Sequence, residues 1–480
     1  MTKKQAFLDN VVGAIVLIGT SIAPWLLGST TEIGYWFITV LGFFVGAVVC
    51  VNKRLFVSGA FPSGVVSFAA RRGGAIVWLA AILLILYIVV SILNPAAELK
   101  YSFFPGIGEA VGVDIEYFDP IIWLPHTYDK ARTLKALIKY VSLLFWFIAA
   151  RAWFSGNTYN TENVDKDCRV FPTRRFTVFL WTISINSAVL AFVGILQRLD
   201  GTDKLLWLFH NHLNGGQGAF GPFPYQSNGA QLLNLVWPIM VGFWFTKQPR
   251  SNDIAEMVRN IGRDTSVVLV MLIALVIGGV VVAKSRGAVI VLVYLIILVC
   301  IVVGKYCFVN NAVKVVGVCI LLLGLVVGAW TGGQDLINRF SNEELFRMSG
   351  RTLIYDDASR MVDDFIIFGS GAETFAPLMF FYRNKDPNWN AYAHNDYLET
   401  IITFGGIGFV LVVFVFLGFM LFPVLGDGVA APPEFILLMF AAISGILLHA
   451  RFDLPFQIYS LHFEFVVICS FFSCLKWRSF

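Results

Sequence analysis

The sequence predicts an all-α membrane protein with about twelve transmembrane helices, and three observations predict this fold class. Hydrophobic residues make up 58% of the 480 residues, charged residues only 14%, and the mean hydropathy is +0.75. Soluble domains carry about 25% charged residues. The apolar residues are also gathered in runs of about 20, the length that crosses a bilayer as a helix. The same values exclude a disordered chain and a soluble enzyme with a single anchor.

The apolar runs give the expected order of the spans. The first follows the basic start Met1–Lys4, and no clear small-residue cleavage site precedes the second run. We therefore interpret it as a retained helix rather than a cleaved signal peptide. The expected spans are 8–28, 33–51, 73–93, 135–154, 176–196, 228–246, 266–283, 287–303, 313–330, 398–422, 435–452 and 459–475.

We expect two parts in the chain. Residues 1–196 form an N-terminal bundle of about five helices, and residues 197–475 form a transmembrane core that includes a long outer connection, 331–397. Within this connection, Arg351–Phe368 places apolar residues at helical spacing and acidic residues on the other face. We expect a short amphipathic helix there, lying on the outer membrane–water boundary.

The charges orient the bundle. Lys and Arg gather in the short loops on one side, which the positive-inside rule assigns to the cytoplasm together with both termini. The three long connections, 94–134, 197–227 and 331–397, lie outside. A nucleic-acid partner would require a basic stripe, and the sequence contains none. Membrane lipids are the expected surroundings of the chain. None of the 7 cysteines falls in an outer loop, which argues against a disulfide framework.

All 6 histidines fall on or near the outer face in this topology, which points to that face as the place where polar chemistry collects. They are His126, His210, His212, His394, His449 and His462.

The turn Lys284-Ser285-Arg286-Gly287 lies at the outer end of a predicted helical hairpin. Charges at the ends of spans are functional candidates. The guanidinium of Arg286 presents a planar fork suited to two phosphate oxygens, and no acid lies nearby in the sequence to pair with it. We predict that Arg286 binds an anion, whereas snorkelling to the interface explains Lys284.

A second cluster begins at His394, where the third outer connection enters a span. A neutral histidine there can accept a proton from a hydroxyl, with Asp396 or Glu399 to orient it or stabilise its charge. The same stretch also suits a helix start, with Asn395 as the cap and the two acids complementing the helix dipole. The helix start does not explain His394, which we predict to be functional.

A third cluster, His449–Gln457, begins at the end of the eleventh span. Taken alone, Arg451 and Asp453 are explained by an ion pair at a helix end. Arg351, on the expected amphipathic helix, is either solvated or faces an anionic lipid head group. We find no convincing metal-binding spacing and no nucleotide-binding loop, and we expect neither a metal nor a cofactor.

Together these stretches resemble the O-antigen ligase and Wzy-type polysaccharide polymerase superfamily of bacterial inner membranes. They occur in the family's order between about residue 200 and residue 460. The matching stretches are Ser285-Arg286-Gly287, Gly350-Arg351 with Phe368–Phe375, Ala393–Leu398 with Gly405–Gly408, His449–Gln457 and, more weakly, Gly221-Pro222-Phe223.

The resemblance implies a GT-C-like, inverting, metal-independent glycosyltransferase of O-antigen or exopolysaccharide synthesis, active at the periplasmic face. The donor would be a glycan on undecaprenyl pyrophosphate. The acceptor would be a hydroxyl of lipid A core, for a ligase, or of another lipid-linked glycan, for a polymerase. By position, His394 would activate this hydroxyl and Arg286 would bind the pyrophosphate, supported by Asn395, Asp396, His449 and Asp453.

The chain departs from the family before Gly221, where an arginine is often found. Residues 215–220 contain no cation, so the second positive charge would come from Arg198, Arg351 or Arg451. This departure and the His449–Asp453 ending favour a polymerase slightly.

A transporter or flippase of lipid-linked glycan fits the composition equally well. Transporters, however, place their binding groups near the midplane on broken helices. Here the ionisable groups gather at the outer boundary, which favours the enzyme.

Overall fold

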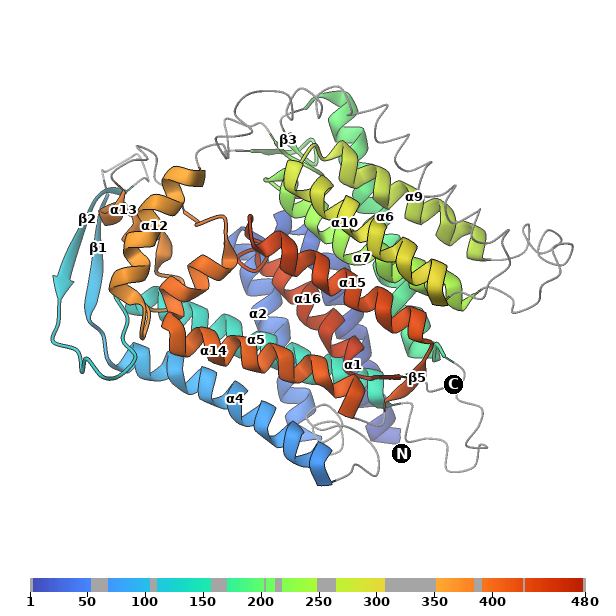
Figure 1. Ribbon diagram of the computed structural model, residues 1–480, viewed down its shortest axis with the longest axis horizontal. Coiled ribbons are helices and arrows are strands. Elements are labelled where there is room, and N and C mark those ends of the chain that lie inside the picture. The colour runs from blue at the N-terminus through green and yellow to red at the C-terminus, as the bar shows by residue number, and fades with distance from the viewer. Residues whose placement is uncertain are drawn as a thin grey trace, which may run out of the picture.

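Long apolar helices make up most of the computed structural model, which describes residues 3–52, 68–103, 110–156, 171–202, 204–211, 218–247, 265–306, 351–383, 391–425 and 428–477. Within these ranges, ten helices are long and apolar enough to cross a membrane. The protein is therefore an all-α polytopic membrane protein, as predicted. The ten are α1 (Lys3–Ile22), α2 (Glu32–Val51), α4 (Phe68–Leu93), α5 (Lys130–Ser155), α6 (Arg174–Asp200), α7 (Gln226–Thr246), α9 (Thr265–Val282), α10 (Arg286–Tyr306), α14 (Asp396–Leu425) and α15 (Pro433–Ala450) (Figure 1).

Eleven of the twelve predicted spans coincide with helices, and the twelfth, 313–330, lies outside the described residues. The last helix, α16 (Tyr459–Phe472), has 14 residues. At 1.5 Å per residue it covers about 21 Å, less than the roughly 30 Å of a bilayer core. The predicted span 459–475 was therefore too long. The chain leaves the helix at Ser473 and forms β6 (Leu475–Trp477), which pairs in parallel with β5 (Val429–Ala431).

One buried apolar cluster runs through the bundle, from Val12 in α1 to Leu475 in β6. The outward faces of the helices are apolar as well. Along α10, for example, Ile290, Val293 and Ile297 are each more than half exposed, as lipid-facing side chains should be. The division of the chain at residue 196 stays a prediction.

Helix α7 is the most enclosed of the ten, because 89% of the residues in its most apolar stretch are buried. Its neighbours are α6, α9, α10 and α15. Its sequence explains this position, because the polar side chains of Gln226, Ser227, Asn228, Gln231 and Asn234 are costly against lipid. Inside the bundle several of them find partners: Asn234, for instance, donates a hydrogen bond to the Ala288 carbonyl at 2.9 Å.

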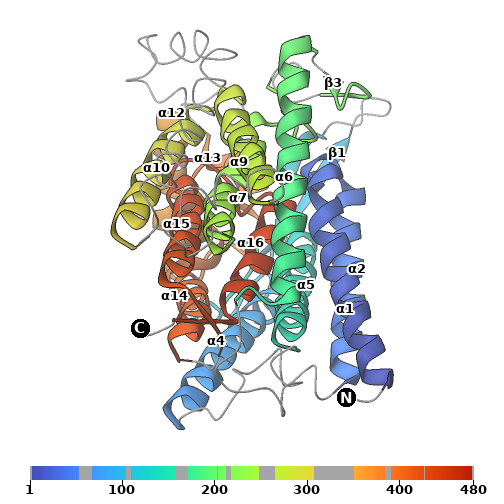
Figure 2. The same ribbon diagram turned by 90° about the vertical axis from the view of Figure 1, so that its right-hand side faces the viewer.

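The two ends of the bundle differ in their elements. The start of α1 lies at the same end as β5 and β6 (Figure 2), which agrees with termini on one side. The opposite end, called the outer end below, carries the remaining short elements. They are η1 (Ala23–Trp25), η2 (Leu27–Ser29), β1 (Ala97–Phe103), β2 (Ala110–Tyr117), β3 (Lys204–Leu205), β4 (Phe209–His210), α12 (Arg351–Phe365) and α13 (Phe375–Tyr382). The antiparallel β1–β2 hairpin was not predicted.

The predicted amphipathic helix is present as α12, but its surroundings differ from the expectation. Ile354, Ala358, Met361 and Phe365 form its apolar face and are buried in a cluster with α13 and α14. We expected this face to lie on the membrane boundary. It packs on protein because Phe375–Tyr382 supplies a second apolar helix, which the sequence reading did not anticipate.

Two glycine-rich stretches hold this outer layer in place. Helix α14 is broken at Gly405, whose φ of 64° lies in the left-handed region, and Gly369 has φ 72°. A Cβ at Gly405 would lie 2.3 Å from the Ile367 carbonyl oxygen, and one at Gly369 would lie 2.4 Å from that of Thr403. Only glycine fits either position. The two backbones are also joined by the hydrogen bond from Gly371 N to Thr403 O at 3.0 Å.

Candidate active site at the outer end

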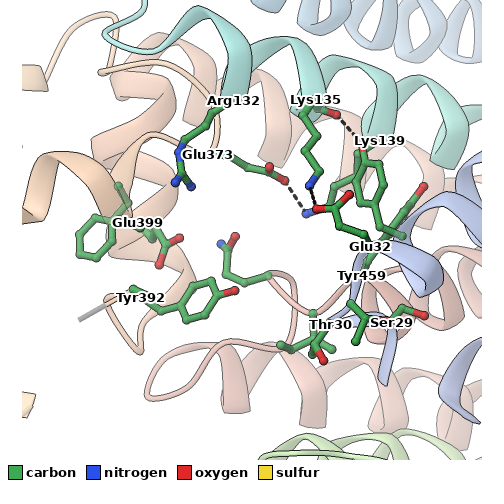
Figure 3. A pocket seen from close by; sticks show the side chains of 17 residues that line it. Ser29, Thr30, Glu32, Arg132, Lys135, Lys139, Glu373, Tyr392, Glu399 and Tyr459 are labelled. Atoms are coloured by element: carbon green, nitrogen blue, oxygen red, sulfur yellow. Dashed lines mark hydrogen bonds and ion pairs between the residues drawn. The ribbon is translucent and has the colours of Figure 1, made fainter. Parts of the chain in front are cut away.

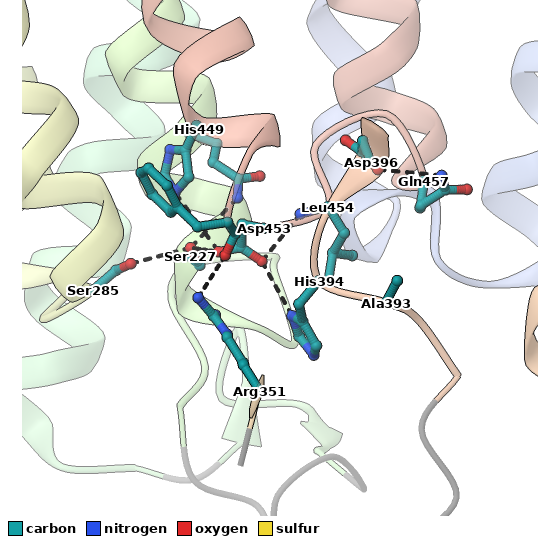
Figure 4. Close-up of polar contacts among 12 residues, drawn as sticks. Ser227, Ser285, Arg351, Ala393, His394, Asp396, His449, Asp453, Leu454 and Gln457 are labelled. Carbon is teal, nitrogen blue, oxygen red and sulfur yellow. Dashed lines mark hydrogen bonds and ion pairs between the residues drawn. The ribbon is translucent and has the colours of Figure 1, made fainter. Parts of the chain in front are cut away.

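The first turn of α7 and the preceding Tyr225 contact several elements of the outer end. Ser227 donates from its hydroxyl to Asp453 Oδ2 at 2.5 Å and accepts a hydrogen bond from Ser285 at 3.0 Å (Figure 4). Tyr225 lies edge-on to the His394 ring, with the ring centroids 6.2 Å apart, and the charge of Arg351 acts on its hydroxyl. These contacts bring together side chains that are distant in the sequence.

His394 is held in an unusual conformation beside Asp453. Its Nδ1 lies 3.4 Å from Asp453 Oδ1, and its side chain is 25% exposed whereas that of Asp453 is 3% exposed. The backbone φ of His394 is +51°, a conformation that costs about 1–3 kcal/mol for a residue other than glycine. The Tyr355 hydroxyl donates to the His394 carbonyl at 3.1 Å and helps to hold it. Strain of this kind is concentrated at functional sites.

Asp453 is a buried carboxylate in a dense set of donors. Besides Ser227 and His394, it accepts from Leu454 N at 3.1 Å, and His449 Nε2 lies 3.6 Å away. Burial raises the pKa of Asp453, but the neighbouring His394 and His449 rings and the charge of Arg351 outweigh burial and hold the pKa well below its usual range. The ionised carboxylate can therefore orient the His394 ring and stabilise its protonated form.

Asp396 does not have the role that was considered for it. Its Oδ2 accepts from the backbone N–H of Phe456 at 2.9 Å and its Oδ1 accepts from Gln457 Nε2 at 3.2 Å. In Figure 4 it lies on the Gln457 side, away from the His394 ring. Asp396 therefore ties the start of α14 to the segment after α15, and the carboxylate beside His394 is that of Asp453.

The other polar residues at the start of α14 act on the backbone. Asn395 Oδ1 accepts from Leu398 N at 3.2 Å, which confirms Asn395 as the helix cap. Glu399 Oε2 accepts from Ala393 N at 3.0 Å, so the second acid considered as a partner of His394 also binds elsewhere. Both residues shape the segment from which His394 projects.

Three arginines lie at or beside the starts of α7, α10 and α12 at the outer end. Arg351, at the start of α12, donates to the Phe452 carbonyl. Arg286 begins α10, is half-buried, and forms no ion pair among the described residues. Arg198 bonds Gln226, whose side chain lies 3.5 Å from the Lys284 carbonyl in the hairpin turn. Arg198 of α6 thus places a cation near the hairpin turn at Lys284, although residues 215–220, before Gly221, contain none.

Arg451 is placed differently. Its side chain is exposed, and no acid among the described residues forms an ion pair with it. The helix-end pair with Asp453 that we considered from the sequence is wrong, because Asp453 faces inward to His394 and Ser227. Arg286, Arg351 and Arg451 were all considered for binding the pyrophosphate. The structure brings Arg351 to the His394 site and places Arg286 at its edge.

Gly287 allows the hairpin to approach the site closely. A Cβ at this position would lie 2.8 Å from the Phe452 ring and 3.2 Å from His449 Nε2. The turn that carries Arg286 therefore lies directly against the segment that carries His449. The N-termini of α7 and α10 meet here through Ser227 and Ser285, and their dipoles favour an anion.

Sequence reasoning missed Tyr225, Gln226 and Ser227 as members of the site. A signal for them was present: the polar run Gln226-Ser227-Asn228 stands at the outer start of an otherwise apolar span. Such a run is costly unless it is enclosed, and here it is enclosed at the site.

Residues 269–413 match the family model described as O-antigen ligase, which confirms the resemblance over that segment. The segment includes Arg286, Arg351 and His394, whereas Ser227 and Asp453 lie outside it. No curated protein matches the chain. The family implies, in general terms, a membrane enzyme of glycosyl transfer that acts on lipid-linked glycans.

Proposed function

We propose that the protein, whose residues 269–413 match the O-antigen ligase family model, transfers a glycan from undecaprenyl pyrophosphate to an acceptor hydroxyl. The reaction takes place at the periplasmic face of the bacterial inner membrane, with both termini in the cytoplasm. The observation that carries this proposal is the contact between His394 and the buried carboxylate of Asp453, 3.4 Å apart beside cationic side chains.

The chemistry requires a base and a site for the leaving group. Nε2 of His394 accepts the proton of the acceptor hydroxyl while the oxygen forms a bond to the anomeric carbon. The bond from that carbon to the pyrophosphate oxygen breaks, and undecaprenyl pyrophosphate leaves with its electron pair. Asp453 stabilises the imidazolium that forms. Attack from the face opposite to the leaving group inverts the anomeric configuration.

The pyrophosphate is placed against Arg286 and Arg351, with Arg198 as the further cation. Guanidinium groups neutralise the charge that develops on the phosphate oxygens, and the starts of α7 and α10 add their dipoles. Pyrophosphate is already a good leaving group, so no strong acid is required. We expect transfer to continue unchanged in the presence of EDTA, because arginines balance the phosphate charge in this proposal.

The acceptor is either lipid A core or another lipid-linked glycan. The absence of a cation in residues 215–220 favours the second, and so a polymerase of O-antigen or exopolysaccharide. Comparing the two acceptors with purified protein and one donor decides between them. A polymerase lengthens the lipid-linked glycan and leaves lipid A core unmodified.

A flippase of the same donor is the alternative, and the break of α14 at Gly405 is the feature that favours it, since transporters use broken helices. The backbone groups near this break are bonded to residues 366–371, however, and are not left for a ligand.

The two functions are separated by reconstituting the protein in vesicles with a fluorescent lipid-linked glycan. We expect a new glycosidic product whose formation requires His394. Movement of the label across the bilayer without any new product would instead support the flippase.

A further inference from the structure

A polar cavity of about 230 Å³ lies at the outer end, near the segment that carries His394. Figure 3 shows the side chains that line it. Ala391 and Tyr392 line it, whereas His394, which follows two residues later, does not. Its other walls come from the end of η2, the starts of α2 and α5, the start of α13, and residues 457–459.

Charges of both signs alternate around this cavity. Arg132, Lys135 and Lys139 are spaced by three and four residues, so they lie on one face of α5. Lys135 Nζ lies 2.5 Å from Glu32 Oε1, and Lys139 Nζ lies 3.0 Å from Glu373 Oε1. The Lys139 side chain is only 5% exposed, and burying a charge costs free energy unless the charge is well paired.

The alternation decides the class of ligand. A phosphate or carboxylate would approach Glu32 and Glu373 as well as the cations, and a cation would meet the lysines. A neutral polyhydroxyl ligand suits both, because each hydroxyl can donate to a carboxylate and accept from an ammonium group. Tyr392 also lines the cavity (Figure 3) and offers an apolar face, which suits the C–H surface of a sugar ring.

We propose that this cavity binds a sugar residue of the acceptor glycan, an assignment that rests on the function proposed above. The arginines assigned to the donor, Arg286 and Arg351, do not line the cavity. An acceptor held here therefore presents its hydroxyl to His394 from a side other than that of the pyrophosphate. Inversion requires such an arrangement, because attack and departure take place on opposite faces of the anomeric carbon.

The wall between the cavity and His394 is built from paired groups. Gln457 and Glu399 line the cavity. Gln457 donates to Asp396 at 3.2 Å, and Glu399 accepts from Ala393 N at 3.0 Å. A sugar that contacts Gln457 or Glu399 thus touches a side chain that is hydrogen-bonded to the segment Ala393–Asp396, which carries His394.

The first test is kinetic and uses a substitution that fills the cavity with a larger side chain. Ala391 lines it and is exposed, so Ala391→Trp narrows the space without disturbing the core. Ser359→Trp, on the exposed face of α12, is the matched control. For the acceptor that the wild-type protein uses, Ala391→Trp should raise KM at least about tenfold, with the donor KM within about twofold of wild type. An unchanged acceptor KM, or a raised donor KM in its place, overturns the assignment.

A binding test does not depend on transfer. Saturation-transfer NMR of the purified protein with free glucose, galactose and N-acetylglucosamine should give sugar signals that Ala391→Trp removes and Ser359→Trp keeps. Signals that persist in Ala391→Trp, or that inorganic phosphate abolishes, exclude a sugar site in this cavity. If the wild-type protein transfers no glycan, the proposed function fails, and the NMR result alone decides on the cavity.

Discussion

The two ends of the bundle use buried charge in different ways. At the inner end, Arg175 of α6 contacts both oxygens of Asp9 in α1 and the carbonyl of Trp153, and the side chains are 13% and 3% exposed. The guanidinium of Arg175 is thus occupied by protein acceptors, and both oxygens of Asp9 face it. At the outer end, Arg286 has no ion pair among the described residues, and Asp453 is shared by two histidines and a serine.

This difference separates structural from functional charge. A closed pair such as Arg175–Asp9 fixes two helices and has little capacity left for a ligand. The outer groups keep hydrogen-bonding capacity for a ligand. Arg286 offers N–H donors, and the Nε2 atom of His394 is available because Nδ1 faces Asp453. The comparison therefore predicts that outer variants lose transfer while inner variants lose stability.

The largest effect on transfer is expected for His394→Ala. Removal of the base should lower kcat by about 10²–10⁴-fold while the protein still inserts and elutes as a folded species. His210→Ala is the matched control, because His210 is another outer histidine with an exposed side chain. Rates of glycan transfer by purified variants measure the effect, and wild-type activity in His394→Ala would end the assignment of the base.

Arg286→Ala should rank next, at about 10²–10³-fold in kcat, since it removes a charge from the departing pyrophosphate. Arg451→Ala provides the comparison, because its side chain is exposed and forms no ion pair among the described residues, and we expect a change within about twofold. A larger loss in Arg451→Ala than in Arg286→Ala would move the pyrophosphate to the other side of the site.

Asp453→Asn should lower kcat by about 10- to 150-fold, the value of a hydrogen bond to a charged group. The pKa of Asp453 is depressed in the folded protein, so its stabilising effect is complete above the usual carboxyl pKa, about 4, and is lost as pH falls through the lower folded value. Titration of Asp453 should therefore not shape the pH–rate profile at neutral pH. A wild-type kcat in Asp453→Asn would show that His394 needs no partner.

The smallest effect on transfer is expected for Arg175→Ala at the inner end. Asp9 would be left buried without its partner, which costs about 3–5 kcal/mol. The thermal midpoint of unfolding should fall clearly, whereas kcat per folded molecule should match wild type. A loss of kcat with unchanged stability would contradict the division between the two ends.

The spans and the outer histidine were predictable because they depend on local sequence. Run length alone locates most helices, and His394 is unexplained by the helix cap that accounts for Asn395. The partner of His394 was not predictable in this way. Asp453 lies 59 residues from His394, whereas Asp396 is two residues away and was the natural choice from sequence proximity.

Other parts of the site depend on packing that the sequence alone does not determine. Ser227 meets Asp453 across 226 residues, and this contact exists only because α7 is enclosed by α15 and its other neighbours. The cavity is a similar case. Lys139 lies inside a predicted span, and its charge was a signal there. Its partner Glu373 becomes adjacent only when the segment before α13 lies against the start of α5, where Thr133 also donates to the Ala372 carbonyl.

The first turn of α7 makes the site sensitive to helical register. Gln226 and Ser227 are adjacent residues with different partners, Arg198 and Asp453. One residue inserted within α7, just after this turn, would rotate the turn by about 100° relative to the rest of the helix. Both contacts would be lost at once, although no side chain had been removed. Insertions and deletions in this turn should therefore be tolerated far less than substitutions.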